Sequence, residues 1–205
     1  MLQRKAKSAK TLDILTRINN IPELEPFYLA GGTALALQIG HRISYDLDFF
    51  CNCKIENENI LEAITVLKPF QLLSQSKNIL VINIRNQKVG FVKYPYEMIN
   101  SINDEGGFRF ASTEDIAAMK LAAITGRGRK RDFTDIYYLL QRYSLEQMLE
   151  LYSKKYPEGN RLMVLRSMTY FEDAEPDPMS KLLSEKVHWS DIKKCISEKV
   201  RNITT

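Results

Sequence analysis

Residues 29 to 50, with the sequence LAGGTALALQIGHRISYDLDFF, decide the fold because they join a glycine pair, a short helix and an acidic strand. In that strand Asp46 and Asp48 alternate with Leu47 and Phe49, which is the two-residue period of a half-buried β-strand. Both carboxylates therefore leave one face, with their Cα atoms roughly 7 Å apart. This pair suits Mg²⁺, which completes its coordination with water and substrate phosphates, and two such ions can clamp a phosphoryl displacement.

The glycine pair predicts a phosphate cradle. Residues 27 to 30 are expected to form a short buried strand, Gly31 and Gly32 a tight turn, and residues 33 to 39 a helix. The free N–H groups and positive dipole at the start of that helix favour an anion. We therefore expect a triphosphate between the glycine turn and the aspartates.

Arg42 and Ser44 precede the acidic pair and add hydrogen-bond donors for the same phosphates. A Gly-Gly pair alone is usually only a turn, and an Asp-x-Asp pair alone is usually solvated. In this order, with a helix between them, the two motifs together are much more specific for a nucleotide site.

Length and composition describe an ordinary globular protein. The 205 residues suit one domain or two small ones, with 44% hydrophobic and 26% charged residues. A net charge of +4 is too mild to establish nucleic-acid binding. No apolar run is long enough to span a bilayer, and the basic start leads into no signal-type segment. These features predict a cytoplasmic protein without a membrane association.

The three cysteines, Cys51, Cys53 and Cys195, are an odd number and suggest no disulfide framework. We therefore expect a reducing compartment, with Cys51 and Cys53 as small residues that finish a strand rather than as metal ligands.

The chain divides into an α/β or α+β core, residues 1 to 110, and a helical part, residues 111 to 205. In the core, a helix over residues 2 to 19 and another over 56 to 67 are expected to flank a mixed sheet. That sheet combines the strands near residues 28 and 48 with strands at 70 to 76, 79 to 85 and 88 to 94. The helical part predicts helices from Ser112 to about 126, then at 132 to 141, 144 to 155, 159 to 169 and 189 to 201.

Residues 120 to 135, KLAAITGRGRKRDFTD, form a second unusual stretch, with basic side chains crowded around a glycine turn. The neighbours of Lys120 are apolar, so a lysine there needs an anionic partner. Asp132 and Asp135 lie one helical turn apart. The cluster either holds phosphates of a nucleotide or RNA, or is a solvated basic loop whose aspartates cap a helix. For Asp132 both interpretations stay open.

Taken together, these motifs resemble the AbiEii/AbiGii nucleotidyltransferase toxin family, which includes the MenT-type toxins and shares its core with DNA polymerase beta. The resemblance covers nearly the whole chain from about residue 10. The motifs that carry it are Gly31-Gly32-Thr33, Arg42, Ser44, Asp46, Asp48, Ser112-x-x-Asp115-x-x-x-x-Lys120, Arg127-Gly128, Arg131-Asp132-Phe133-x-Asp135 and Tyr170-Phe171-x-Asp173-Ala174-Glu175.

The resemblance implies a nucleotidyltransferase-fold sheet with flanking helices, followed by a helical bundle that completes the active site. The implied reaction transfers a nucleoside monophosphate from an NTP with Mg²⁺, or alternatively Mn²⁺, and releases pyrophosphate. The implied acceptor is RNA, such as a tRNA 3′ end, and a cognate antitoxin restrains the enzyme. The implied site residues are Asp46, Asp48, Lys120 and Asp135 for catalysis, Asp46 and Asp48 for metal, and Gly31, Gly32, Thr33, Arg42, Ser44 and Arg131 for nucleotide.

Two alternatives stay open. Many nucleotidyltransferases place a third carboxylate on a later core strand, where this chain has Gly90. A degenerate fold that binds nucleotide or a partner without turnover is therefore one alternative. The other is transfer to a small molecule, as in aminoglycoside nucleotidyltransferases, which share a Gly-Gly and Asp-x-Asp arrangement.

Overall fold

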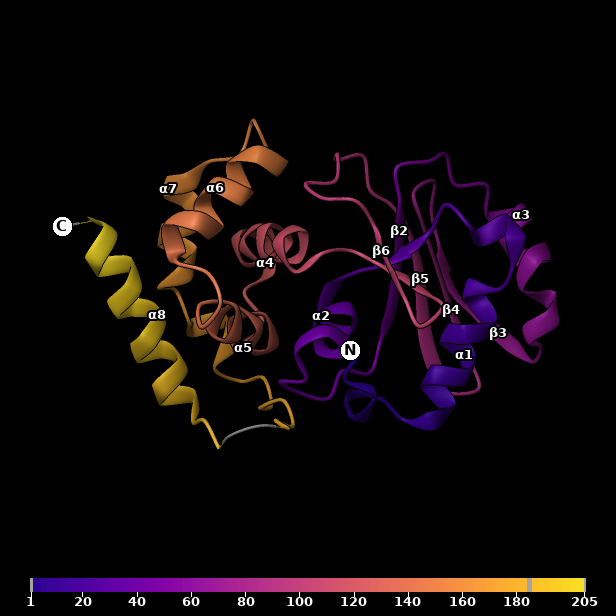
Figure 1. Ribbon diagram of the computed structural model, residues 1–205, viewed down its shortest axis with the longest axis horizontal. Helices are drawn as coiled ribbons and strands as arrows, with labels where there is room; N and C mark the ends of the chain where they lie inside the picture. The colour runs from indigo at the N-terminus through magenta and orange to yellow at the C-terminus, as the bar shows by residue number, and fades with distance from the viewer. Residues whose placement is uncertain (1, 184–185, 205) are drawn as a thin grey trace. The chain divides into compact units, whose positions relative to one another are not determined.

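The computed structural model describes residues 2–183 and 186–204, and the chain forms two compact units (Figure 1). Unit 1 is Met1–Ser112 and contains the sheet, whereas unit 2 is Thr113–Thr205 and is built from helices. The sequence placed this change of structure at residue 110. None of the helices in the described ranges combines the length and the apolar character needed to cross a membrane.

The sheet of unit 1 has seven strands among the described residues, in the order β3-β4-β5-β2-β1-β7-β6. It is mixed, since β2 runs parallel to β5 and β1 parallel to β7, while the other neighbouring pairs are antiparallel. This confirms the predicted mixed sheet. The strands are β1 (Tyr28–Leu29), β2 (Leu47–Cys51), β3 (Phe70–Gln75), β4 (Ile79–Ile84), β5 (Gln87–Lys93), β6 (Asn103–Glu105) and β7 (Phe108–Phe110).

Strand β2 lies inside the sheet, between β5 and β1. Its burial alternates as the sequence predicts: Leu47 and Phe49 are fully buried, while Asp48 and Phe50 on the other face are half-buried. The Phe49 ring stacks on Phe91 of β5 at a centroid distance of 5.5 Å. Aromatic packing on one face thus fixes the strand that carries the carboxylate on the other.

The N-terminal helix is shorter than predicted. A single helix was expected over residues 2 to 19, but the structure has a 3₁₀ turn, η1 (Arg4–Ala6), followed by α1 (Ala9–Asn19). Ser8 separates them because its side chain accepts a hydrogen bond from the Thr11 N–H as the N-cap of α1. This leaves Lys7 in the connection between the two elements.

The helix after β1 starts earlier than predicted. Gly31 and Gly32 were expected to form a turn, but they are the first residues of α2 (Gly31–Ile39). The turn is compressed into Gly31, whose φ of 64° lies in the left-handed region. The predicted stop is confirmed, since Gly40 caps α2 in the left-handed conformation with φ of 67°.

The hairpin of β6 and β7 was not predicted. A two-residue Gly106-Gly107 loop with φ of 65° and 79° joins the strands, and glycine adopts such angles without strain. Strand β6 is exposed and polar, so it lacks the apolar alternation that marks a strand in sequence. The helix expected over residues 56 to 67 is instead α3 (Asn57–Ala63) followed by the 3₁₀ turn η3 (Ile64–Leu67). A further 3₁₀ turn, η2 (Pro22–Leu24), lies between α1 and β1.

The expectation that no cysteines pair was wrong for two of them. Cys51 ends β2, and its sulfur is joined to that of Cys53, with 5.3 Å between the Cα atoms. The chain turns after the strand, which brings two cysteines only two residues apart within bonding reach. The cysteine pattern consequently loses its value as a sign of a reducing compartment, while Cys195 is free.

Unit 2 is arranged around α4, which packs against α5, α6 and α7, while α8 packs against α5, α6 and α7. A buried ion pair joins α6 to α4, because Lys155 Nζ lies 2.7 Å from Asp115 Oδ1 and both side chains are fully buried. The predicted helices are present, although α5 begins at Lys130 rather than Asp132. The elements are α4 (Thr113–Arg127), α5 (Lys130–Leu139), α6 (Leu145–Lys155), α7 (Arg161–Met168), η4 (Glu172–Ala174) and α8 (Trp189–Thr204).

A buried amide fixes the loop that precedes the acidic strand. Gln87, at the start of β5, donates from Nε2 to the Tyr45 carbonyl and accepts from Thr11 Oγ1 at 2.8 Å. Its side chain is only 8% exposed. One residue therefore ties α1 and β5 to the residue just before Asp46.

We predict that Gln87→Met lowers the free energy of unfolding by about 1–3 kcal/mol, because the Tyr45 carbonyl and the Thr11 hydroxyl both lose a buried partner. Urea denaturation measures the effect. Gln71→Met on the exposed face of β3 is the matched control and should change stability little. Equal stability of the two variants would contradict the role given to Gln87.

Candidate active site

The acidic pair occupies one face at the start of β2. Asp48 lies in the strand and Asp46 directly precedes it, and both are half-buried while Leu47 between them is fully buried. The α2 helix packs against β2, and the Ala30 N–H donates to the Asp48 carbonyl at 2.9 Å. The carboxylates and the start of α2 are consequently held in one piece of structure.

Two glycines leave room around the Asp48 carboxylate. A Cβ atom at Gly31 would lie 3.8 Å from Asp48 Oδ2, and one at Gly90 would lie 3.3 Å from Asp48 Oδ1. Gly90 is the register partner of Asp48 across the parallel pair of β2 and β5. Gly90, which stands where a third carboxylate was expected, thus lies directly beside Asp48. A larger side chain at position 90 would crowd the Asp48 carboxylate.

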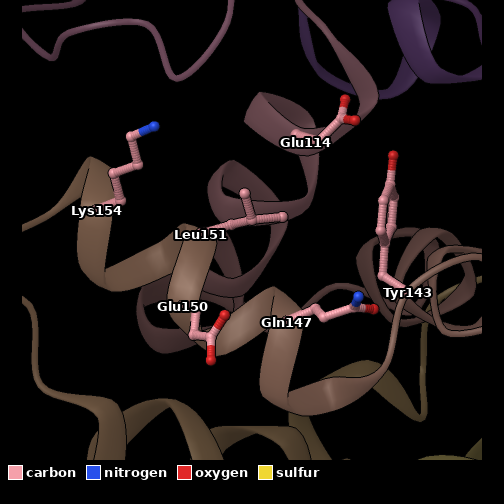
Figure 2. A pocket seen from close by; sticks show the side chains of 6 residues that line it. All are labelled: Glu114, Tyr143, Gln147, Glu150, Leu151 and Lys154. Atoms are coloured by element: carbon pink, nitrogen blue, oxygen red, sulfur yellow. The ribbon is translucent and has the colours of Figure 1, made fainter.

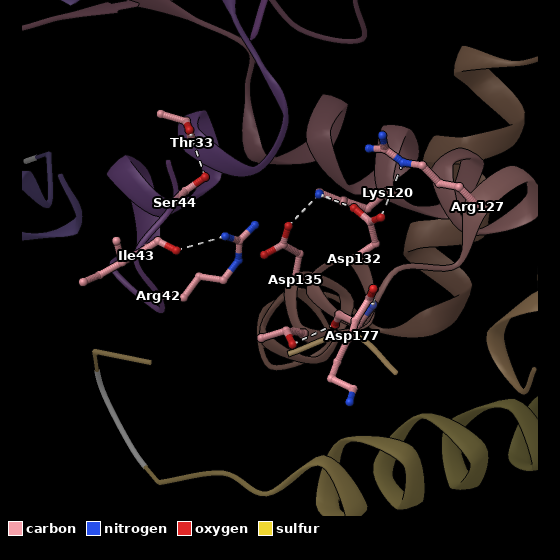
Figure 3. A network of polar contacts seen from close by, with 11 residues as sticks. Thr33, Arg42, Ile43, Ser44, Lys120, Arg127, Asp132, Asp135 and Asp177 are labelled. Atoms are coloured by element: carbon pink, nitrogen blue, oxygen red, sulfur yellow. Dashed lines mark hydrogen bonds and ion pairs between the residues drawn. The ribbon is translucent and has the colours of Figure 1, made fainter. Parts of the chain in front are cut away.

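The start of α2 has the features of an anion site. Its N-cap is Ala30, which makes no side-chain cap, and the N–H groups of the first turn precede the first intrahelical bond. A Cβ atom at Gly32 would overlap the Arg42 guanidinium. Arg42 is 3% exposed, and its Nη1 donates to the Ile43 carbonyl at 3.1 Å (Figure 3). A larger residue at position 32 would therefore have to displace the Arg42 guanidinium from the backbone.

Thr33 and Ser44 hold the site together through their hydroxyl groups. The Thr33 hydroxyl donates to the Asp46 carbonyl and lies 2.9 Å from Ser44 Oγ (Figure 3). Since a hydroxyl carries one proton, the Ser44 hydroxyl is the donor in the second bond. Both side chains are buried, so their hydrogen bonds fix the entry to β2.

Lys7 is a charged residue of this region that the sequence analysis did not single out. Its side chain is 8% exposed, and its Nζ is buried without a hydrogen-bond partner in the described part of the chain. Burial lowers the pKa of Lys7 to about 7; the Asp46 and Asp48 carboxylates raise it and the Arg42 guanidinium lowers it. Lys7 thus lies in the electric field of the acidic pair.

The donor set fits a Mg²⁺ ion that is completed by its substrate. Within the described ranges, no group of three or more His, Cys, Asp or Glu side chains gathers as a metal-ligand cluster. Mg²⁺ does not need one, because one or two carboxylates suffice when water and substrate phosphates supply the rest. Asp46 and Asp48 offer that pair, with space kept open beside Asp48 by Gly31 and Gly90.

Unit 2 contributes a buried triad of charges (Figure 3). Lys120 Nζ on α4 lies 2.7 Å from Asp132 Oδ1 and 2.6 Å from Asp135 Oδ2, both on α5. Both aspartates are fully buried, and Arg127 Nε lies 3.6 Å from the second oxygen of Asp132. The anionic partner expected for Lys120 is therefore this pair of carboxylates, and the triad joins the two helices.

The basic turn before α5 is partly neutralised by a later loop. Asp177 accepts from Arg129 Nη1 at 2.9 Å and from the Lys130 N–H at 3.1 Å, and so caps the start of α5. Burial raises the pKa of Asp177, but these hydrogen bonds and the charges of Arg129 and Lys130 together hold it below its usual value. The idea that Asp132 caps this helix was wrong, because Asp132 faces Lys120. Arg131 is exposed on α5.

A separate pocket of about 340 Å³ lies in unit 2, where it is lined by residues of α4 and α6 and by Tyr143 (Figure 2). Tyr143 Oη lies 2.7 Å from Thr113 Oγ1, and burial raises the pKa of this phenol. None of the predicted site residues is among its lining residues, which are Glu114, Tyr143, Gln147, Glu150, Leu151 and Lys154.

Sequence reasoning missed Lys7, Gln87 and Asp177 as members of these networks. Lys7 is one of three lysines within the first ten residues, and nothing in the sequence distinguishes the buried one from Lys5 and Lys10. Asp177 lies 47 residues from the N–H group that it caps. The only sequence signal near Asp177 is the pair of prolines that flank it, Pro176 and Pro178, which indicates a loop but not a helix cap.

We predict that Lys7→Met stabilises unit 1, and that this gain shrinks as the pH rises. The pKa of Lys7 is lowered on folding, so below pH 7 the folded state must bury a charge that the unfolded state keeps in water. Between about pH 7 and pH 10 the folded lysine is neutral while the unfolded one still binds a proton, so wild-type stability rises relative to the variant. Urea denaturation in EDTA at pH 6 to 9 measures the difference, and a gap that widens with pH would contradict it.

We predict that Lys120→Met destabilises the protein by about 3–5 kcal/mol, because it leaves two carboxylates buried without their shared cation. Chemical denaturation at neutral pH measures this loss. Lys154→Met, at an exposed position of α6, is the control and should behave like wild type. A stable Lys120→Met variant would show that the triad is not structural.

The chain is similar to known proteins over most of its length. A model of the family "Nucleotidyl transferase AbiEii toxin, Type IV TA system" matches residues 13–104 and 83–199. An uncharacterized protein, aq_aa25 from Aquifex aeolicus (strain VF5), is 31% identical over 195 residues, which are 92% of this chain and 93% of the relative.

Two solved structures share the fold. JHP933 from Helicobacter pylori matches with a TM-score of 0.60 and 23% identity, over 99% of this chain and 93% of its own. MenT4, a nucleotidyltransferase toxin from Mycobacterium tuberculosis H37Rv, matches with a TM-score of 0.56 and 17% identity, over 94% of this chain and 83% of its own. The fold is therefore the α/β nucleotidyltransferase fold, and the family match extends over most of the chain. The chain belongs to the AbiEii family of nucleotidyltransferase toxins, as the sequence motifs predict.

Proposed function

We propose that this nucleotidyltransferase transfers a nucleoside monophosphate from an NTP to RNA, such as a tRNA 3′ end, with Mg²⁺ or Mn²⁺ at Asp46 and Asp48. The observation that carries the proposal is the acidic pair on one face of β2, packed against the uncapped start of α2. A helix start that favours anions beside two half-buried carboxylates suits a metal–triphosphate complex.

The proposed reaction is an in-line displacement at the α-phosphorus of the NTP. The acceptor hydroxyl oxygen forms a bond to the α-phosphorus, and the bond from that phosphorus to the bridging oxygen of the β-phosphate breaks, which releases pyrophosphate. When bound, the divalent ion supplies positive charge that neutralises the triphosphate and aligns it. Asp46 and Asp48 hold that charge in place.

The triphosphate is assigned to the backbone and side chains at the start of α2. The N–H groups of Gly31, Gly32 and Thr33 point from the first helical turn, where the dipole favours negative charge. Arg42 adds a guanidinium beside Gly32. Ser44 shares a hydrogen bond with Thr33, so its first role is to hold that residue.

We assign Lys120, Arg131 and Asp135 of unit 2 to the same reaction. Asp135 matches an acid of the family motif and would accept the proton of the acceptor hydroxyl. Its support is a carboxylate held at 2.6 Å by Lys120 in a buried position. Lys120 orients Asp135 and adds positive charge for the phosphates, and Arg131 is an exposed cation for a phosphate.

RNA as acceptor and a cognate antitoxin as partner rest on the family. The AbiEii family is described as the toxin of type IV toxin–antitoxin systems, and a toxin of this kind needs a cellular target. The exposed side chains of Arg127 and Arg129 add positive charge at the turn before α5. We place the reaction in the cytoplasm, where NTPs and tRNA are found.

We predict that Asp48→Asn reduces transfer of label from an α-labelled NTP at least 100-fold, because it removes a charge that holds the metal. The assay combines the protein, each labelled NTP in turn, Mg²⁺ and total RNA. Asp104→Asn, on the exposed strand β6, is the matched control and should retain activity. Full activity of Asp48→Asn would contradict the assignment of the acidic pair.

The same assay separates the acceptor classes. RNA and a set of aminoglycosides are offered in parallel as acceptors, and label is expected on RNA. Label on an aminoglycoside alone would support the small-molecule alternative instead. NTP binding without pyrophosphate release in the presence of either acceptor would contradict the proposal.

A further inference from the structure

Lys7 places a buried amino group in the electric field of the acidic pair. Lys7 Nζ is buried and has no hydrogen-bond partner in the ranges that the structure describes. By contrast, the exposed side chains of Lys5 and Lys10 nearby reach solvent. A buried polar group without a partner is rare in folded proteins and calls for one.

The position of Lys7 is fixed by the segment that carries it. The Gln3 N–H donates to the Leu37 carbonyl at 2.6 Å, which ties the segment to α2. The Gln3 side chain also packs on Gly40, where a Cβ atom would lie 2.9 Å from its Cγ. After Lys7 the chain is fixed again by Ser8, the N-cap of α1. The lysine is therefore held between two anchored elements rather than on a loose terminus.

The charges that act on Lys7 come from the residues of the proposed nucleotide site. Asp46 and Asp48 act on the ammonium favourably, and Arg42 acts on it unfavourably. The lysine accordingly shares its surroundings with the proposed metal ligands and with the proposed phosphate-binding arginine. An anion with several acceptor oxygens would satisfy Lys7 and relieve its repulsion with Arg42.

Lys120 differs from Lys7 because its ammonium group is already paired with carboxylates. Its Nζ is within 2.7 Å of carboxylate oxygens of both Asp132 and Asp135. A phosphate would have to share that ammonium with two buried carboxylates. Within the described ranges Lys7 Nζ makes no such bond, so its N–H groups are available to a phosphate oxygen.

We propose that Lys7 is a substrate-binding residue, whose ammonium donates a hydrogen bond to the triphosphate of the NTP held between α2 and the acidic pair. The inference rests on the proposed function, because it takes NTP as the substrate. It extends that function by giving the N-terminal segment before α1 a direct part in nucleotide binding.

Isothermal titration with each NTP in the presence of Mg²⁺ tests the proposal on the full chain, comparing wild type, Lys7→Met and Lys10→Met. Loss of a hydrogen bond to a charged group should weaken NTP binding by Lys7→Met roughly 10- to 100-fold. Lys10→Met should bind like wild type. Pyrophosphate, used as a probe without a nucleoside, should show the same loss, whereas Lys7→Arg should recover part of the affinity.

The outcomes separate the two proposals. If wild type binds an NTP and Lys7→Met binds it equally well, the role of Lys7 is overturned and the proposed function stands. If wild type binds no NTP, both fail. Tighter Mg²⁺ binding by Lys7→Met with unchanged NTP affinity would overturn the inference, because Lys7 would then act only as a counter-charge to the carboxylates. The denaturation series described above for Lys7→Met shows whether the variant is folded.

Discussion

The parallel pairing of β2 with β5 is the constraint on which the site of unit 1 depends. It places Asp48 opposite Gly90, and it packs Phe49 on Phe91 in the core. A shift of one residue would exchange the faces and bury the carboxylate while exposing the aromatic ring. Burial of the Asp48 carboxylate and exposure of the Phe49 ring would both cost free energy. The contacts that fix the register of β2 therefore also fix the position of Asp48.

Much of this arrangement follows from local sequence. The alternation around Asp48 predicts the strand and its exposed face, and Gly40 predicts the end of α2, because each depends on a few neighbouring residues. The burial of Lys7 does not follow, since it depends on a segment tied to Leu37 far along the chain. The pairing of Cys51 with Cys53 was also missed, because odd counts of cysteine say nothing of how a chain turns after a strand.

The site of unit 2 shows how one lysine serves two neighbours. The sequence predicts an anionic partner for Lys120, but not that Asp132 and Asp135 both supply it, since this requires the crossing of α4 and α5. Removal of Lys120 leaves both carboxylates buried without their shared cation. Loss of activity in a variant of this triad therefore has to be separated from loss of folding before a catalytic role is assigned.

Asp177 makes the start of α5 different from the start of α2. Its carboxylate already occupies the start of α5, where it accepts from the Lys130 N–H, whereas the start of α2 has no side-chain cap. At the start of α5 an incoming anion would compete with the Asp177 carboxylate, whereas at the start of α2 it would meet no capping side chain. The start of α2 therefore leaves its first N–H groups to an anion from outside the chain, whereas the start of α5 already carries a carboxylate of its own.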